Sequence, residues 1–285
     1  MSDRGLVEIP YEGVFSLSDT LKSGQLFHWE PAELDGCRGF AGCIGSLGPS
    51  FITQTEEGRV LGFRNDKALL SAYFGLNHPI TSIHATFPQG DSVLDEAIAY
   101  CPGIRLARQP MWECLATFIT SSLKQVAHIR AISMKLRSRY GEAHELAGQS
   151  FYSYPKPQAI ARAGEDALRE CSLGYRAKSL HLAAQAIESG SFDLAQLEKE
   201  RDPEKVMAAL LELHGVGEKI ANCVLLFSGG FHGAFPIDVW IERILRENYR
   251  KRVKGAKLQK WAVDYFGANA GYAQQYLFHF ARKTL

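Results

Sequence analysis

Along the first hundred residues, apolar and polar positions alternate in short runs that are separated by glycine-containing turns. Residues 26–29 (Leu, Phe, His, Trp) and 51–53 (Phe, Ile, Thr) are two such runs within the segment 6–63. A period of two residues is typical of strands with one buried face. The pattern therefore predicts an antiparallel sheet, followed by helices at 67–76 and 92–100.

After Cys101, Pro102 and Gly103, apolar residues recur three and four positions apart, which is the spacing of an amphipathic helix. Glycine, proline and aspartate separate the successive segments, so short turns are expected between helices. The chain is thus predicted to be an α+β protein, with an antiparallel β-rich N-terminal domain at 1–103 and a larger all-helical body at 104–285. Helices of the body are expected at 112–122, 126–139, 157–163, 165–171, 177–189, 203–213, 217–228, 239–247, 256–267 and 270–282.

Composition excludes several classes of protein. Hydrophobic residues make up 46% of the chain and charged residues 22%, as in ordinary globular domains. No run approaches the ~18 consecutive apolar residues of a membrane helix, and residues 1–10 lack the pattern of a secretory signal. The six cysteines form no CxxC pair, so neither a zinc site nor a disulfide framework is indicated. We expect an intracellular protein with reduced thiols and no membrane contact.

Charge is distributed unevenly along the chain. Residues 1–100 carry 6 basic and 13 acidic side chains, whereas residues 101–285 carry 26 and 18. Within 243–260 the basic residues crowd together, and Glu247 is the one acidic residue among them. Such a tract attracts a polyanion, although a solvated helix face has the same composition.

Residues 213–221 (Leu-His-Gly-Val-Gly-Glu-Lys-Ile-Ala) lie between one predicted helix and the start of the next. Glycine lacks a Cβ, so Gly215 and Gly217 allow a tight turn and a close approach to another surface. Free backbone amides at the start of a helix can hold a phosphate without contacting bases. The pattern indicates a helix-hairpin-helix that holds a DNA backbone, and an ordinary tight turn between helices is the alternative.

Lys219 lies in the first turn of the second helix of this motif. A lysine is a nucleophile when its amine is neutral, and burial beside the positive end of a helix disfavours the ammonium form. Such an amine can attack an electrophilic carbon and form a Schiff base. Cys223 lies one turn later on the same helix face, where it can line the same pocket. A solvated surface lysine and a small buried cysteine are the ordinary alternatives.

Asp238 comes 19 residues after Lys219 and directly before the amphipathic run 239–247. Its position is that of an N-cap, which stabilises a helix by about 1 kcal/mol. The same carboxylate can stabilise positive charge at a sugar C1′ as a glycosidic bond breaks. We expect it near the sugar without a tight ion pair to Lys219, because such a pair would favour the ammonium form.

With these residues in this order, the chain resembles the helix-hairpin-helix (HhH-GPD) superfamily of DNA glycosylases, and within it the 8-oxoguanine DNA glycosylases that also act as lyases. The resemblance covers nearly the whole chain. It implies a body of two helical subdomains with the active site between them, no organic cofactor and no iron–sulfur cluster. It also implies a monomer that acts on double-stranded DNA containing oxidised guanine. Besides the hairpin with its lysine and aspartate, the motifs are Ser23-Gly24-Gln25 with Phe27 and Trp29, Trp112-Glu113-Cys114-Leu115 leading to Ser121-Ser122, Gly174-Tyr175-Arg176-Ala177, and Gly271-Tyr272-Ala273-Gln274 with Leu277-Phe278.

The resemblance implies how the damaged base is recognised and removed. Gly24 is similar to the residue whose backbone carbonyl accepts the N7 hydrogen that 8-oxoguanine has and guanine lacks. Phe278 and Cys223 are similar to the two faces that stack on the flipped base, and Gln274 to the residue that bonds its Watson–Crick edge. Lys219 would displace the base, form a Schiff base at C1′ and permit β-elimination of the 3′ phosphate.

Further residues are implied to contact DNA or a cation. Tyr175 resembles the wedge that fills the vacated base stack, and Arg176 the group that recognises the orphaned cytosine. Gly215, Val216 and Gly217 would hold a phosphate at the hairpin. The backbone carbonyls of Leu211, Leu213 and Val216 resemble those that hold a monovalent or similar cation against a DNA phosphate.

Two departures from the family pattern concern the opposite base and one phosphate. After the paired serines, the better-studied eukaryotic members have an asparagine-rich run and then an arginine that help to identify cytosine. This chain has Leu123, Lys124 and Gln125, with His128 further on in the predicted DNA interface. A strict demand for cytosine opposite the lesion is therefore not expected. Trp240 stands where those members have a histidine that contacts a phosphate.

The sequence leaves two other kinds of function open. Related glycosylases for alkylated purines generally lack the lysine, and those of the endonuclease III type usually have a four-cysteine iron–sulfur loop, whereas no cysteine follows Cys223. A DNA-binding module without catalysis would use the hairpin as a phosphate clip. Borohydride reduction with lesion DNA separates these functions, since it would trap an enzyme covalently through Lys219 and would not trap a binder.

Overall fold

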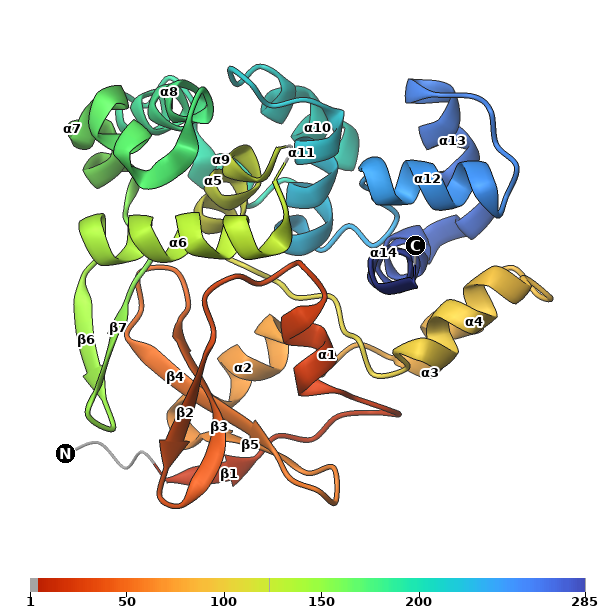
Figure 1. Cartoon of the computed structure of the whole chain (residues 1–285), viewed down its shortest axis with the longest axis horizontal. Coiled ribbons are helices and arrows are strands. Elements are labelled where there is room, and N and C mark those ends of the chain that lie inside the picture. Colours follow the sequence, from red (N-terminus) through yellow and green to blue (C-terminus); the bar gives the residue numbers. More distant parts are fainter. Residues whose placement is uncertain (1–4, 123, 285) are drawn as a thin grey trace.

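The computed structural model describes residues 5–122 and 124–284. Figure 1 shows a small sheet at one end of the molecule and a larger group of helices beside it. The sheet has five antiparallel strands in the order β1-β5-β4-β3-β2, as the alternating pattern predicts. Residues 26–29 precede β2 and are not part of a strand, whereas 51–53 lie in β4. The strands are β1 (Leu6–Glu8), β2 (Glu30–Leu34), β3 (Cys37–Cys43), β4 (Pro49–Gln54) and β5 (Val60–Phe63).

Short helices accompany this sheet. The predictions at 67–76 and 92–100 are confirmed by α2 and α4. Helices α1 and α3 were not predicted, because six and five residues are too few to show a helical period. The Ser16 side chain begins α1 by accepting a hydrogen bond from the Asp19 amide. The symbol η marks a short 3-10 or π-helix. The bounds are α1 (Leu17–Lys22), η1 (Arg64–Asp66), α2 (Lys67–Tyr73), α3 (Ile80–His84) and α4 (Ser92–Tyr100).

Helices make up most of the body, and α5 lies at its centre with all 11 of its residues buried. Each helix predicted in the body is present, and Gly164, with φ of 80°, interrupts α7 where the sequence predicted a break. No helix among residues 5–122 and 124–284 is both long and apolar enough to cross a membrane. The elements are α5 (Met111–Ser121), α6 (Val126–Tyr140), α7 (Pro157–Leu168), η2 (Arg169–Leu173), α8 (Arg176–Glu188), α9 (Leu194–Leu197), α10 (Pro203–Leu211), α11 (Glu218–Val224), η3 (Leu225–Gly229), α12 (Val239–Glu247), α13 (Gly255–Phe266), η4 (Gly267–Asn269) and α14 (Ala270–Thr284).

The body also contains a β-hairpin, so it is not helical throughout. Strands β6 (Ala143–Leu146) and β7 (Gln149–Tyr152) pair in antiparallel register. The turn between them places Ala147 and Gly148 at φ of 50° and 74°, and alanine gives no sequence signal for such a turn. Leu146 and Phe151 share a buried apolar cluster with residues of the N-terminal sheet. The hairpin therefore attaches the body to that sheet.

The apolar core of the body begins before the predicted boundary at residue 103. Ile80 and Leu94 belong to the same buried cluster as Leu115 of α5 and Tyr276 of α14. Helices α3 and α4 thus pack with the body, while the sheet has clusters of its own. The division at residue 103 stays a prediction about the domains.

A buried charged network joins the sheet to the body. Glu113 of α5 and Arg137 of α6 are 2% and 1% exposed. Arg137 donates a hydrogen bond to Glu113, whose other oxygen accepts from the Gly45 amide at 2.8 Å. His28 Nδ1 lies 3.3 Å from the Glu113 carboxylate, and Arg137 also donates to the Cys43 carbonyl at 3.3 Å. One carboxylate thus satisfies groups from both parts of the fold.

Replacing Glu113 by glutamine is expected to destabilise the protein strongly. The change leaves Arg137 as a buried charge without its anion, which typically costs about 3–5 kcal/mol, or roughly 10 °C in Tm for a chain of this size. Thermal unfolding followed by circular dichroism measures the effect. The control is Glu165→Gln, which removes an exposed ion pair with Arg169 and should change Tm little. Equal Tm values for the two variants would contradict the role of the network.

Five histidines are buried or partly buried where the N-terminal segments meet the body. Burial lowers the pKa of His78 and of His279 to about 4. It also lowers the pKa of His84 and His232, and that of His28 well below its usual value. These side chains are neutral in the folded protein at neutral pH. Protonation therefore favours the unfolded chain, in which they recover a pKa near 6.5.

Stability is expected to be complete above pH 6.5 and to fall as the pH drops from 6.5 toward about 4, because the unfolded chain binds more protons there. The midpoint of urea unfolding measured across this range tests the expectation. His78→Gln should flatten the dependence, whereas His128→Gln, at an exposed position, should leave it as it is. A midpoint that is constant over this range would show that burial of the histidines has no effect on stability.

Candidate active site

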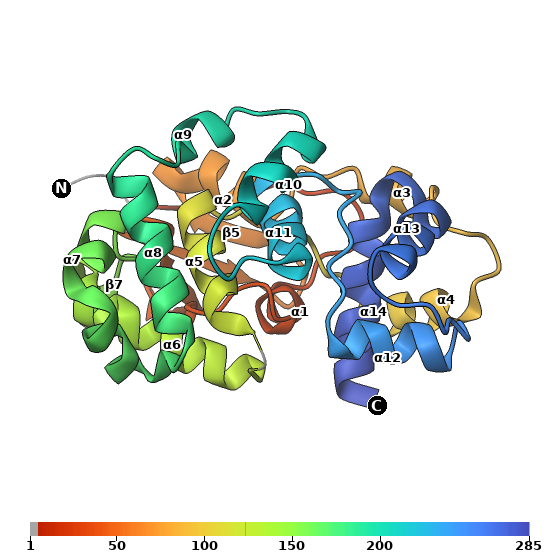
Figure 2. The ribbon, with the colours of Figure 1, turned by 90° about the horizontal axis from the view of Figure 1, so that it is seen from above.

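One large cavity opens between the body and the segment that follows α1. Its volume is about 1130 Å³, and its walls come from residues 21–31 and from helices α5, α6, α11, α12 and α14. In Figure 2, helices α12 and α14 lie to the right of α1 and α11. Six residues predicted from the sequence line this cavity, namely Gly24, Lys219, Cys223, Asp238, Gln274 and Phe278.

The Lys219 side chain projects from the first turn of α11 into the cavity. Gly217 is the N-cap of this helix, so the amine lies near the positive end of the helix. The Nζ atom is 3.1 Å from the Ser121 hydroxyl and 5.1 Å from the centroid of the Phe118 ring. The Ser121 hydroxyl donates to the Phe118 carbonyl at 2.7 Å, so it accepts from the lysine. An aromatic ring and a hydroxyl oxygen thus hold the amine at the wall of the cavity.

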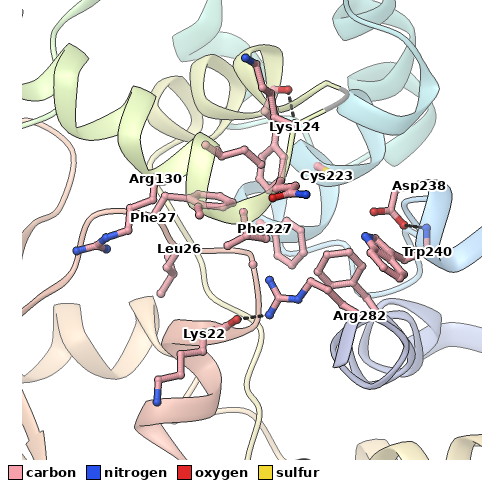
Figure 3. Close-up of a pocket in the computed structure, with 18 of the residues that line it drawn as sticks. Lys22, Leu26, Phe27, Lys124, Arg130, Cys223, Phe227, Asp238, Trp240 and Arg282 are labelled. Atoms are coloured by element: carbon pink, nitrogen blue, oxygen red, sulfur yellow. Dashed lines mark hydrogen bonds between the residues drawn. The ribbon is translucent and has the colours of Figure 1, made fainter. Parts of the chain in front are cut away.

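Asp238 lies across the cavity at the start of α12 (Figure 3). Its Oδ1 atom accepts hydrogen bonds from the Trp240 amide at 3.1 Å and the Ile241 amide at 2.9 Å. Burial raises the pKa of the Asp238 carboxyl, while these amides and the charge of Lys219 act in the opposite direction. The carboxylate is thus bonded as a helix cap, and the lysine donates its hydrogen bond to Ser121.

Gly24 lines the cavity, and no hydrogen bond to its backbone carbonyl is seen within the described residues. Its neighbours are engaged: the Ser23 carbonyl accepts from the Gln275 side chain at 2.9 Å, and the Gln25 carbonyl from the Gln109 side chain at 3.0 Å. The Gln25 side chain in turn bonds the backbone of the segment before α5. The turn is therefore held from both sides, and one acceptor is left free at the cavity.

Glycine is required at position 24 for two reasons. Its φ is 83°, a conformation that other residues adopt at a cost. A Cβ atom there would lie 2.9 Å from Cε1 of Phe278 and 3.3 Å from Val126. The backbone and the Phe278 ring approach each other so closely that no side chain fits between them.

Gln274 is held so that its side-chain oxygen acts as an acceptor. Its Nε2 donates to the Pro236 carbonyl at 3.1 Å, and its Oε1 is buried without a partner in the described structure. A buried acceptor of this kind is costly unless a ligand satisfies it. Burial raises the pKa of the Cys223 thiol to about 11, so the thiol is protonated and offers a weakly polar surface.

The residues predicted to contact DNA lie outside the cavity. Tyr175 is 60% exposed at the start of α8, whereas Arg176 is 6% exposed. The Arg176 guanidinium lies 4.3 Å from the Tyr175 ring centroid and donates to the Ser122 carbonyl. His128 is exposed on α6. Leu123, in the departure from the family pattern, lies outside the described residues.

The hairpin has the geometry that its glycines predict. Gly215 has φ of 78°, and a Cβ atom there would meet the Ser179 hydroxyl at 2.2 Å. Gly217 is exposed, and a Cβ atom there would meet nothing within 4 Å. The Val216 amide donates to the Leu213 carbonyl at 3.0 Å, and Leu211 is 42% exposed. Within the described residues, no group of three or more histidine, cysteine, aspartate or glutamate side chains could hold a metal ion.

Some residues of the cavity were not predicted from the sequence. Phe118 and Ser121 contact Lys219, although they are about a hundred positions away in the chain. Trp240 and Arg282 also line the cavity (Figure 3). The spacing of Arg282, four residues after Phe278 on one helix, could have placed it on the same face.

Comparison with known families covers most of the chain in two consecutive segments. Residues 8–115 match the N-terminal domain of 8-oxoguanine DNA glycosylases. Residues 116–259 match the HhH-GPD superfamily of base excision DNA repair proteins. The motifs of the sequence analysis fall within these segments except the one at 271–278, which lies beyond residue 259.

Curated relatives extend over most of the chain. The N-glycosylase/DNA lyase of Saccharomyces cerevisiae is 30% identical over 274 residues, which are 87% of this chain and 72% of that protein. The N-glycosylase/DNA lyase OGG1 of Arabidopsis thaliana is 27% identical over 281 residues, which are 91% of this chain and 75% of the relative.

Solved structures agree with these matches. A structure of MBOgg1 with a low-affinity DNA ligand is 31% identical, has a TM-score of 0.87, and is matched over 98% of this chain and 95% of that chain. The 8-oxoguanine glycosylase/lyase of Clostridium acetobutylicum, bound to duplex DNA with cytosine opposite 8-oxoguanine, is 26% identical with a TM-score of 0.87 and 99% of each chain covered. A 3-methyladenine DNA glycosylase of Archaeoglobus fulgidus, at 21% identity and a TM-score of 0.74, shares the fold. The chain therefore belongs to the 8-oxoguanine DNA glycosylases of the HhH-GPD superfamily of base excision DNA repair proteins.

Proposed function

We propose that this protein flips 8-oxoguanine out of duplex DNA, removes the base through attack by Lys219 at C1′, and then cleaves the strand by β-elimination. The observation that carries the proposal is the position of the Lys219 amine in a cavity that also presents two unpartnered acceptors, the Gly24 carbonyl and Gln274 Oε1. The named lyase relatives and the 8-oxoguanine complex support the same reaction.

Recognition of the base would use both acceptors. The Gly24 carbonyl would accept the N7 hydrogen, which guanine does not have. Gln274 Oε1 would accept the N–H groups of the Watson–Crick edge, because its amide nitrogen is already committed to Pro236. Phe278 and the protonated Cys223 thiol would stack on the two faces of the base. The site would satisfy its buried acceptors when the oxidised purine enters.

The reaction would begin with Lys219 as a neutral amine. Its lone pair forms a bond to C1′ while the C1′–N9 bond breaks and its electrons leave with the base, which gains a proton. Asp238 would stabilise the positive charge that develops on the sugar. The adduct becomes a Schiff base when the ring oxygen takes up a proton and leaves C1′. Loss of a C2′ proton then expels the 3′ phosphate.

DNA would lie across the mouth of the cavity, with a backbone phosphate at Gly215, Val216 and Gly217. The open space around Gly217 suits such a contact. The carbonyls of Leu211, Leu213 and Val216 would hold a monovalent cation that neutralises part of the phosphate charge. Of these three, the Leu213 carbonyl already accepts a hydrogen bond from the Val216 amide at 3.0 Å, so a cation would be its second partner. The protein would act as a monomer inside the cell.

Tyr175 would fill the vacated base stack, because its ring is exposed and lies directly before the first residue of α8. Arg176, whose guanidinium packs on this ring, would contact the orphaned base. In the structure its guanidinium donates to Ser122, so contact with a base would require it to exchange that partner. His128 would contact the DNA strand from α6. We infer a tolerant interaction with the opposite base.

Replacing Lys219 by glutamine is expected to abolish base release while DNA binding is retained, because glutamine has no nucleophilic amine. Excision from a duplex containing 8-oxoguanine measures release, and borohydride reduction tests for the covalent Schiff base. The matched control is Lys205→Gln, which changes an exposed lysine of α10. Full excision by the Lys219 variant would refute the nucleophile, and a wild-type protein that binds lesion DNA without being trapped would be a non-catalytic binder.

Activity opposite cytosine, thymine, adenine and guanine is expected to differ by less than about a thousandfold. One mismatched contact typically costs about 1–3 kcal/mol, which limits discrimination when few residues touch the opposite base. Excision rates on four duplexes that differ in this base provide the measurement. A larger preference for cytosine would mean that Arg176 and its neighbours recognise that base strictly.

A further inference from the structure

Arg282 places a guanidinium in the wall of the cavity beside Gly24. It lies one helical turn after Phe278 on α14, and its guanidinium carbon is 5.5 Å from the centroid of the Phe278 ring. Its Nη1 atom lies 3.4 Å from the position that a Cβ of Gly24 would occupy. In Figure 3 the side chain extends from α14 toward Lys22, across the cavity wall. The Arg282 guanidinium and the Gly24 backbone thus lie side by side at one edge of the pocket.

The bonds of Arg282 leave part of its hydrogen-bonding capacity unused. Nη2 donates to the Lys22 carbonyl and lies 3.3 Å from His279 Nδ1. Nε is buried without a partner among the described residues, and no hydrogen bond of Nη1 to them is seen. Burial lowers the pKa of the guanidinium, and the negative charge of Asp238 raises it. Arg282 is partly buried, and a buried donor atom such as Nε is costly to leave unsatisfied, so the guanidinium suits an acceptor supplied by a ligand.

Oxidation of guanine changes two neighbouring atoms of the base. In guanine, N7 is an acceptor and C8 carries a hydrogen that makes no strong hydrogen bond. In 8-oxoguanine, N7 carries a hydrogen and C8 carries a carbonyl oxygen. The oxidised edge therefore pairs a donor with an adjacent acceptor, and full recognition requires an acceptor and a donor from the protein. Gly24 supplies the acceptor, and Arg282 is the donor beside it.

We propose that Arg282 donates a hydrogen bond to the C8 carbonyl oxygen of the flipped 8-oxoguanine while the Gly24 carbonyl accepts N7–H. This inference rests on the proposed function and adds a specificity residue to it. Guanine would leave both protein groups unsatisfied, so two lost hydrogen bonds oppose its entry instead of one. The guanidinium also faces the ring on which negative charge develops as the base departs, which favours release of the oxidised base.

The test compares two substrates for one variant. Arg282→Met keeps the length and apolar stem of the side chain and removes the donor. Its kcat/KM for 8-oxoguanine excision is expected to fall by about tenfold to a hundredfold, the usual value of a hydrogen bond to a charged group. Cleavage at a preformed abasic site has no base in the pocket, so the ratio of excision to abasic cleavage should fall by a similar factor. Arg282→Lys, which retains a charged donor, should recover part of the ratio.

A second measurement changes the base instead of the protein. In 8-thioguanine a sulfur atom, a weak acceptor, replaces the oxygen while N7–H remains. If Arg282 bonds the oxygen, wild type should prefer 8-oxoguanine over 8-thioguanine, and Arg282→Met should lose most of that preference. The control Arg38→Met removes a charge that is 92% exposed on β3 and should leave both the ratio and the preference as in wild type.

The outcomes separate the inference from the proposed function. An equal loss of excision and abasic cleavage in Arg282→Met would mean that the residue only ties α14 to α1 through Lys22, and would overturn the inference. An unchanged ratio, or an unchanged preference between the two bases, would overturn it as well. If wild type excises no 8-oxoguanine, the proposed function itself fails before Arg282 is considered.

Discussion

The carbonyl of Gly24 is available at the cavity because the groups on either side of it are already bonded. Gln275 of α14 holds the Ser23 carbonyl, and Gln109 holds that of Gln25. The Phe278 ring lies so close that a side chain at position 24 would collide with it. These contacts come from the segment before α5 and from the last helix. The proposed recognition edge at Gly24 therefore depends on packing between the N-terminal segment and the last helix.

A second contact between distant segments joins the sheet to the helical body that carries the proposed nucleophile. Glu113 and Arg137 are buried between them and satisfy backbone groups at Gly45 and Cys43. Buried ion pairs seldom add much net stability, because desolvation offsets their attraction. Their effect here is geometric, since only one arrangement of sheet and body satisfies all of these groups. That arrangement fixes the segment 21–31, which forms one wall of the cavity.

The sequence predicted those parts of the site that depend on local spacing. Gly215, Gly217 and Lys219 belong to a single stretch of chain, so their arrangement follows from helix geometry. Asp238 caps the next long helix, as its spacing before that helix indicates. The partners of Lys219 depend on packing between distant segments, and nothing in the local pattern indicates that Ser121 and Phe118 meet the amine. The hairpin at 143–152 was missed for a different reason, since Ala147 adopts a backbone conformation that the identity of the residue does not suggest.

The hydrogen bonds of the Asp238 carboxylate do not depend on Lys219. If Asp238 depended on the lysine for its partner, loss of the ammonium proton would leave a partly buried carboxylate unsatisfied. Instead two backbone amides at the start of α12 bond its Oδ1 atom, and Arg282 supplies a cationic charge that acts on it from α14. Neither partner changes when the amine loses its proton. In the proposed reaction, Asp238 would therefore keep its hydrogen-bond partners while Lys219 attacks C1′.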